Sequence, residues 1–227
     1  MRYRLRELGV EVRSENAAKP TGFRSKFVLN WIARHARVGL AVDYGCGRLR
    51  YSLPLCSIAD KVIAVDSAEQ LEKLQKVNGV RTTIQDFVRR KRKIKAINVE
   101  EFEAAEFTAD LIICINVLSA IPHKVERRRV ASRVASHLNS TGVCLISVQH
   151  QNSDFNRVQR IGRARAYKDG YIIDMGKWVS FYGLLNRDYI ANVLTGAGLD
   201  VESAFINGQS SYVIARHRAM EGQKGAS

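Results

Sequence analysis

A short glycine turn directly after an apolar run is the first feature of this sequence with chemical meaning. Residues 41–47 read Ala-Val-Asp-Tyr-Gly-Cys-Gly, so Asp43, Gly45 and Gly47 fall where a strand is expected to end. Glycines in such a turn let the backbone approach a ligand closely, and the next helix points its N-terminal amides at the same place. The spacing therefore predicts a ligand-binding turn between a strand and a helix.

A second acidic residue completes the pattern. Asp66 ends the apolar run Lys61-Val-Ile-Ala-Val-Asp66, at about the 20-residue spacing that separates a glycine turn from a ribose-binding acid in nucleoside sites. A carboxylate in that position can accept hydrogen bonds from ribose hydroxyls. Together the two features predict a site for a nucleoside cofactor.

The residues around the turn indicate which cofactor this is. A dinucleotide site favours a third glycine near position 50, but this chain has Arg48, Leu49 and Arg50. Asp43 would repel a pyrophosphate, whereas it suits a cationic ligand. The sulfonium and amino groups of S-adenosylmethionine are cationic, so the sequence favours that cofactor over NAD.

On these motifs the chain resembles the class I S-adenosylmethionine-dependent methyltransferases from Gly39 to Arg216. The family's acidic-x-Gly-x-Gly-x-Gly motif is similar to residues 43–49 and departs from them at Leu49, where the last glycine is replaced. Its ribose-binding acid matches Asp66, and its fourth-strand motif is similar to residues 109–118. The cofactor-binding residues implied by the resemblance are Asp43, Tyr44, Gly45, Cys46, Gly47, Asp66, Ser67, Asn98, Val99 and Asn116.

The order of elements predicts an α/β fold. From residue 42 strands and helices alternate, with helices expected over 50–58, 68–76 and 82–92, which implies parallel strands and a ligand site at their carboxyl ends. The resemblance implies a doubly wound, mostly parallel seven-stranded sheet with helices on both faces. The expected organisation is an N-terminal extension and cover helix over 1–38, a cofactor-binding domain over 39–218, and a flexible tail over 219–227.

Composition limits the possible settings and partners. The chain has 227 residues and a formal net charge of +14, a balance that favours polyanions and most often indicates nucleic acid. No apolar run approaches the ~20 residues needed to span a bilayer. The cysteines and histidines are scattered without metal-ligand spacing, so we expect a cytoplasmic protein with no metal. No feature identifies a protein partner.

Two basic clusters could contact a polyanion. Residues 89–95 are expected at the end of the sheet away from the cofactor, as a solvated helix face. The second cluster follows the fifth strand, and its spacings of three predict guanidiniums along one helix face beside the acceptor site. The candidate nucleic-acid-binding residues are Arg157, Arg160, Arg163 and Arg165. The aromatic residues over 167–182 could stack on a base or simply pack this segment.

Candidates for acid–base chemistry are few. His150 at the end of the fifth strand and His123 after the fourth are the candidate catalytic residues, and Asp154 is a weaker one. Residues 116–119 read Asn-Val-Leu-Ser, which argues against methylation of exocyclic base amines and of carbon five of cytosine. The leading interpretation is methylation of RNA or DNA. Methylation of a small or anionic metabolite, or an inactive cofactor-binding subunit, are the alternatives.

Overall fold

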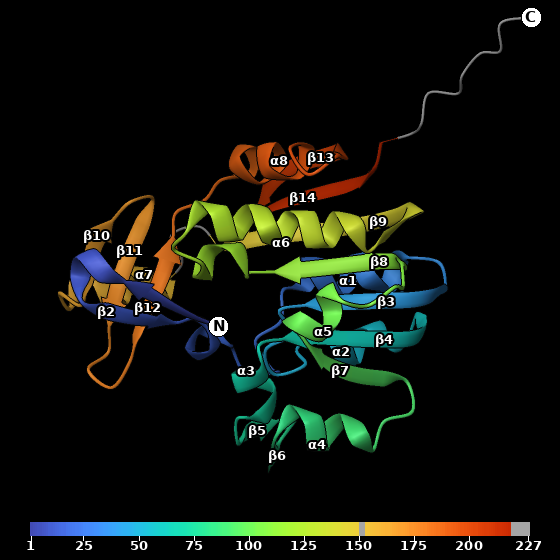
Figure 1. Cartoon of the computed structure of the whole chain (residues 1–227), viewed down its shortest axis with the longest axis horizontal. Coiled ribbons are helices and arrows are strands. Elements are labelled where there is room, and N and C mark those ends of the chain that lie inside the picture. Colours follow the sequence, from blue (N-terminus) through green and yellow to red (C-terminus); the bar gives the residue numbers. More distant parts are fainter. Residues whose placement is uncertain (150–152, 219–227) are drawn as a thin grey trace, which may run out of the picture.

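A seven-stranded sheet forms the centre of the computed structural model, which describes residues 1–149 and 153–218 (Figure 1). In spatial order its strands are β13 (Leu199–Asn207), β14 (Ser210–His217), β9 (Leu138–Gln149), β8 (Ala109–Ile115), β3 (Val38–Tyr44), β4 (Ala59–Asp66) and β7 (Ile94–Asn98). Only β14 runs antiparallel to its neighbours. The predicted mostly parallel sheet is confirmed.

Helices cover both faces of this sheet. They are α1 (Lys26–Arg34), α2 (Ser52–Leu55), α3 (Ala68–Glu72), α4 (Ile84–Arg89), α5 (Val99–Glu103), α6 (Lys124–Ser136), α7 (Ser153–Arg160) and α8 (Arg187–Thr195), with short 3-10 turns η1 (Arg6–Leu8), η2 (Ser14–Ala17) and η3 (Leu118–Ala120). Within β3, Ala41 packs into a core with α1 to α4, and Val42 packs into one with α5, α6 and α8. This doubly wound arrangement confirms the predicted fold class. No helix in residues 1–149 and 153–218 is long and apolar enough to cross a membrane.

A second, smaller sheet stands at the side of the first (Figure 1). Its strands, in spatial order, are β1 (Arg2–Leu5), β2 (Val10–Arg13), β12 (Val179–Gly183), β11 (Gly170–Asp174) and β10 (Ala164–Tyr167). Val12 pairs with Val179, so the N-terminal residues and a late segment of the chain build one sheet. The expected N-terminal extension therefore contains strands, and Tyr3 and Leu5 belong to the hydrophobic core.

A small hairpin replaces part of the helices expected over 68–76 and 82–92. Strands β5 (Gln75–Val77) and β6 (Val80–Thr82) pair antiparallel around Asn78 and Gly79, whose φ angles are +45° and +89°. Asn-Gly is the two-residue sequence that best tolerates positive φ at both positions, which explains why the chain turns here. Helix α3 consequently ends at Glu72.

Candidate cofactor and acceptor site

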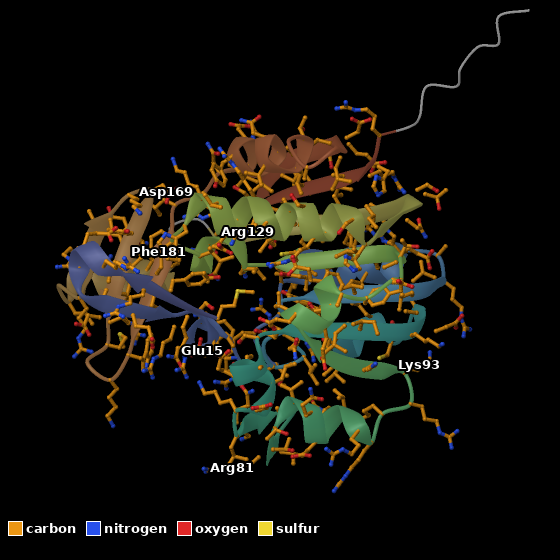
Figure 2. The ribbon with its side chains drawn as sticks, viewed as in Figure 1. Glu15, Arg81, Lys93, Arg129, Asp169 and Phe181 are labelled. Carbon is orange, nitrogen blue, oxygen red and sulfur yellow. The ribbon has the colours of Figure 1, made fainter. Side chains whose placement is uncertain are left out.

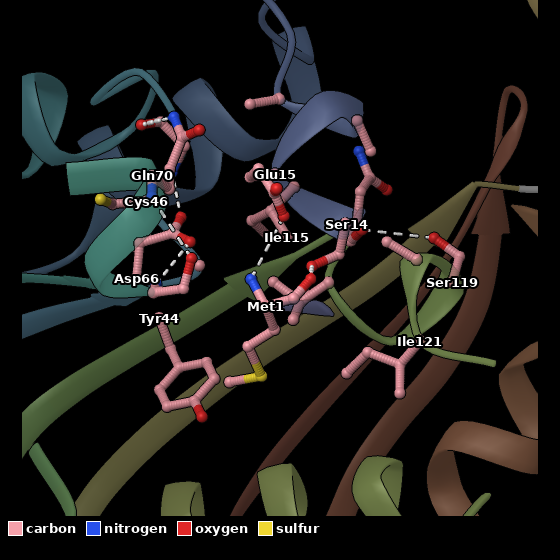
Figure 3. A pocket seen from close by; sticks show the side chains of 18 of the residues that line it. Met1, Ser14, Glu15, Tyr44, Cys46, Asp66, Gln70, Ile115, Ser119 and Ile121 are labelled. Atoms are coloured by element: carbon pink, nitrogen blue, oxygen red, sulfur yellow. Dashed lines mark hydrogen bonds and ion pairs between the residues drawn. The ribbon is translucent and has the colours of Figure 1, made fainter. Parts of the chain in front are cut away.

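A cavity opens at the carboxyl ends of the parallel strands, where the fold predicts ligand binding (Figure 3). Together with the solvent space at its mouth it measures about 1050 Å³, at the upper end of the range for small-molecule sites. Its walls come from the glycine turn after β3, the end of β4, the loop after β8, the end of β9, the segment over 14–19, and β12. Nine of the ten predicted cofactor residues line it.

The glycine turn has the backbone that the sequence predicted. Gly45 and Gly47 have φ angles of +76° and +55°, in the left-handed region that favours glycine. The amides of Gly45 and Cys46 both donate to the carbonyl of Val65, at 2.8 and 2.9 Å. A Cβ added at Gly45 would lie 2.1 Å from a methyl carbon of Val117. The turn is thus fixed against β4 and has no room for a side chain at its first glycine.

Asp66 holds the turn as well as facing the cavity. Its two carboxylate oxygens accept from the amides of Gly47 and Ser67, both at 2.8 Å. Burial raises the pKa of Asp66 above its usual value, although these two hydrogen bonds act in the opposite direction. Each oxygen keeps a lone pair beyond the one used by the backbone, so the carboxylate can still accept from a diol.

Two hydrogen-bonded glutamines hold the other side of the turn. The amide nitrogen of Gln70 donates to the carbonyl of Gly47 at 2.7 Å and to the side-chain oxygen of Gln75 at 3.1 Å. Gln75 in turn donates to the backbone carbonyl of Gln70 at 2.9 Å. Both polar groups of Gly47 are therefore held by side chains. Sequence reasoning missed Gln70 because its partner lies on the unexpected hairpin.

Asp43 lies beneath the turn with one side-chain partner. It is 2 % exposed, and the hydroxyl of Ser52 donates to it at 2.6 Å. Burial raises the pKa of Asp43 to about 6, while the Ser52 hydrogen bond and the charge of Arg50 act against this rise. A buried carboxylate without an ion-pair partner favours the approach of a cation.

The loop after β8 supplies a polar group without a partner. Asn116 has a φ of +64°, and its buried side-chain oxygen has no hydrogen-bond partner among residues 1–149 and 153–218. Its backbone carbonyl accepts from the hydroxyl of Ser119 at 3.3 Å. A ligand that carries an N–H group can satisfy the free amide oxygen, because buried polar groups are almost always paired.

Asn98 is the predicted cofactor residue that lies outside the cavity lining. Its side chain accepts from the amide of Glu101, and Glu101 accepts from the amide of Asn98, both at 2.8 Å. This reciprocal capping box starts α5, so the side chain is used to begin a helix. Its neighbour Val99 does line the cavity.

Comparisons with known proteins agree with this geometry. A family model described as a methyltransferase domain matches residues 21–204. The chain is 38% identical over 208 residues to the uncharacterized protein YmfD of Escherichia coli K12, covering 90% of this chain and 92% of that protein. The chain belongs to the class I S-adenosylmethionine-dependent methyltransferase family.

Solved structures share the fold of this methyltransferase. A crystal structure of an S-adenosylmethionine-dependent methyltransferase from Clostridium acetobutylicum ATCC 824 has a TM-score of 0.63 and 13% identity, and the match covers 89% of this chain and 94% of that one. The 1,6-didemethyltoxoflavin-N1-methyltransferase of Burkholderia thailandensis has a TM-score of 0.59 and 16% identity, over 85% and 77% of the two chains.

Of the two predicted catalytic histidines, His123 belongs to the part of the chain that the structure describes. His123 precedes α6, and its ring contacts the Tyr3 ring edge-on at 5.9 Å between centroids. It is not one of the residues that line the cavity. His150 and the side chain of Asp154 lie outside the described residues.

Of the four arginines in the predicted basic cluster, Arg157 and Arg160 lie on one helix as predicted, and Arg163 and Arg165 do not. Helix α7 ends at Arg160, Arg163 lies in the following turn, and Arg165 is on β10. The prediction failed because Gly162, with φ of +69°, stops the helix. Arg163 and Arg165 line a separate hollow with Leu8. None of the four predicted nucleic-acid-binding arginines lines the methyltransferase cavity.

The basic run over 89–95 lies where the sequence predicted, at the amino end of β7. Lys93 donates to the carbonyls of Cys56 and Ala59 at 2.9 and 3.1 Å, at the start of β4. Figure 2 shows Lys93 at the opposite side of the molecule from Phe181, which lines the cavity.

Proposed function

We propose that this protein transfers a methyl group from S-adenosylmethionine to a small molecule bound in the same cavity. The proposal rests on the part of the cavity wall that the predicted cofactor-binding elements do not supply. Residues of η3, β9 and β12 line the cavity together with the glycine turn, so one hollow offers both a cofactor end and an acceptor end. Strand β12 contacts η2, which belongs to the lining segment over 14–19.

The residues at the cofactor end fit S-adenosylmethionine. Asp66 would accept from the ribose hydroxyls, and the turn at Gly45 and Gly47 would let the backbone pass close to the ligand. The unpaired amide oxygen of Asn116 suits the amino group of the methionine part, and the carboxylate of Asp43 favours its positive charge. When bound, this cofactor supplies an activated methyl group on a sulfonium.

Catalysis by the described residues would consist of positioning. Methyl transfer is an in-line displacement, so a site that holds acceptor and methyl carbon in line supplies much of the rate enhancement. No histidine among the described residues lines the cavity. The acceptor's proton would therefore leave to water.

Two observations support a small acceptor over a nucleic acid. The predicted phosphate-binding arginines lie away from the cavity, on α7 and the edge of the second sheet. The Burkholderia thailandensis neighbour is named for methylation of a small heteroaromatic compound. A nucleic acid acceptor is the second candidate, because the net charge of +14 and the exposed basic residues over 89–95 favour polyanions.

Methyl labelling of fractionated extract tests these alternatives. The purified protein is incubated with radiolabelled S-adenosylmethionine and a cell extract divided into small molecules, nucleic acid and protein. We expect label in the small-molecule fraction, insensitive to nuclease. Label in nuclease-sensitive material would support the second candidate. Calorimetric binding of the cofactor without any labelled product would indicate an inactive subunit.

A further inference from the structure

The two ends of the cavity differ in charge. Its cationic side chains, those of Lys19, Arg48 and Arg50, belong to the segment over 14–19 and to the residues that follow Gly47. Arg48 follows Gly47 directly, and Ala18, next to Lys19, would lie 3.4 Å from a Cβ added at Gly47. These cations therefore surround the part of the site that fits the cofactor, whose methionine part carries a carboxylate.

The residues of η3, β9 and β12 that line the cavity carry no charged side chain, and the ammonium of Met1 and the carboxylate of Glu15, which also line it, pair with each other at 3.4 Å. The lining of the acceptor end consists of Ser119, Ala120 and Ile121 from η3 and the residue after it, Gln149 at the end of β9, and Phe181 and Tyr182 from β12. An acceptor with a carboxylate or phosphate would lose water beside these residues of η3, β9 and β12 and find no cationic side chain on them to compensate. Such a loss is strongly unfavourable.

A buried cation that contacts this wall is paired with a carboxylate. The side chain of Arg127 is fully buried, and its guanidinium carbon lies 5.5 Å from the centre of the Phe181 ring. Both of its terminal nitrogens donate to Asp169, at 2.6 and 2.8 Å. Arg127 therefore supports the wall without offering its charge to a ligand.

The same wall is suited to a flat ring. Phe181 is 3 % exposed, and Tyr182 stacks on Phe155 with 4.8 Å between ring centres and 18° between planes. Rings held in fixed planes bind aromatic ligands at little cost in conformational entropy. Ile121 adds aliphatic surface, and Ser119 and Ala120 are small. The aromatic side chains therefore determine the shape of the acceptor end.

Two polar groups at this end can bind an N–H or O–H group. The hydroxyl of Ser119 donates to the carbonyl of Asn116 at 3.3 Å, which leaves its lone pairs free to accept. The amide of Gln149 lies at the end of β9 and also lines the cavity. Both groups are neutral, so they orient a neutral donor better than they solvate an ion.

We infer that the methyl acceptor is an uncharged aromatic compound carrying an N–H or O–H group. The inference rests on the proposed small-molecule methyl transfer and names its substrate class. A lone pair of the acceptor's nitrogen or oxygen forms a bond to the methyl carbon while the carbon–sulfur bond breaks. The electron pair of that bond remains on sulfur and neutralises its charge, and the acceptor's proton leaves to water.

Ligand-observed NMR on the full chain saturated with S-adenosylhomocysteine tests the inference. The probes are indole and naphthol, each compared with the carboxylate that keeps its N–H or O–H group, indole carboxylate and hydroxynaphthoate. We expect each uncharged probe to bind at least about tenfold more tightly than its carboxylate, because the lining residues of η3, β9 and β12 carry no cationic side chain. Tyr182→Leu should weaken binding of the uncharged probes about fivefold or more through loss of ring contact.

Tyr171→Leu is the matched control, since Tyr171 is an aromatic residue of the same sheet that does not line the cavity. It should leave probe binding within about twofold. Carboxylates that bind as tightly as their uncharged partners, absence of binding by either uncharged probe, or equal effects of the two substitutions would each overturn the inference. Failure of S-adenosylhomocysteine to bind, measured first by calorimetry, would instead contradict the proposed function.

Discussion

The guanidinium of Arg127 and the carboxylate of Asp169 form a bidentate ion pair that joins the two sheets. The N–O distances are 2.6 and 2.8 Å, and the remaining nitrogen of Arg127 donates to the carbonyl of Ile121 at 2.7 Å. The hydroxyl of Tyr189 on α8 also accepts from Arg127, at 3.3 Å. Burial acts to raise the pKa of Asp169, but the hydrogen bonds and charge of Arg127 outweigh it and hold this pKa below its usual value.

Arg127→Lys should destabilise the protein by about 2–4 kcal/mol, because an ammonium cannot satisfy this set of acceptors from one position. Urea denaturation of the full chain measures the effect. Arg129→Lys is the control, since Arg129 is exposed and paired with Glu126 on the helix surface. It should change the free energy of unfolding by less than about 0.5 kcal/mol. Equal stability of Arg127→Lys and wild type would show that the ion pair does not hold the sheets together.

Asp66→Ala should weaken binding of both S-adenosylmethionine and S-adenosylhomocysteine by about 1.5–3 kcal/mol, because it removes a charge-assisted contact to the ribose. It also releases the amide of Gly47. Calorimetric titration gives the two affinities, with Asp188→Ala, at an exposed position on α8, as the control. Unchanged affinities in Asp66→Ala, or tight binding of NAD by the wild type, would rule out the assigned role.

Asp43→Asn should stabilise the ligand-free protein and weaken cofactor binding. The folded pKa of about 6 exceeds the usual 3.8, so the folded state binds the proton more tightly than the unfolded state. Ionisation of Asp43 therefore lowers stability as pH rises through the interval from about 4 to 6. At neutral pH the asparagine variant should be more stable by on the order of 1–3 kcal/mol, and below about pH 4 the difference should vanish.

Thermal denaturation between acidic and neutral pH measures the Asp43 effect, and calorimetry measures the accompanying loss of affinity. Asp60→Asn is the control, because Asp60 lies exposed beside Arg37. A neutral-pH stability of Asp43→Asn at or below that of wild type would mean that burial does not raise this pKa.

Gly45→Ala should disrupt the turn through two separate effects. The left-handed backbone costs an alanine about 1 kcal/mol, and the new methyl would overlap Val117. Gly79 also has a positive φ, +89°, but a Cβ added there would meet no atom within 4 Å, so Gly79→Ala measures the backbone cost alone. Adding Val117→Ala to Gly45→Ala should restore part of the lost stability and cofactor affinity. A double variant no better than Gly45→Ala alone would exclude the steric contribution.

The central sheet and the cofactor end could be predicted because their signals are local. The apolar run of β3, the glycine turn and Asp66 lie within 30 residues, and parallel strands place such residues at one edge. The hairpin also had a local signal, Asn78-Gly79, and so did the cap at Asn98 with Glu101 three residues later. Both signals were readable in the sequence.

The acceptor end could not be predicted because its contacts are long-range. Short strands such as β2 show too few residues to reveal a period, and its partner Val179 lies far along the chain. Helix α6 contains three successive arginines, and nothing local distinguishes Arg127, which is fully buried, from Arg128 and Arg129, which face solvent. Only the tertiary fold decides which cation faces inward.

The pairing of Val12 with Val179 sets an order of events during synthesis of the chain. At the usual pace of translation, β2 leaves the ribosome on the order of ten seconds or more before β12 exists. Strands β3, β4, β7 and β8 have by then all been made, so the cofactor end can assemble on the nascent chain while β1 and β2 still lack their neighbour. The contact between β2 and β12 therefore forms only after these four strands of the central sheet have been made, and a chain that ended before β12 would retain much of the proposed cofactor end without this contact.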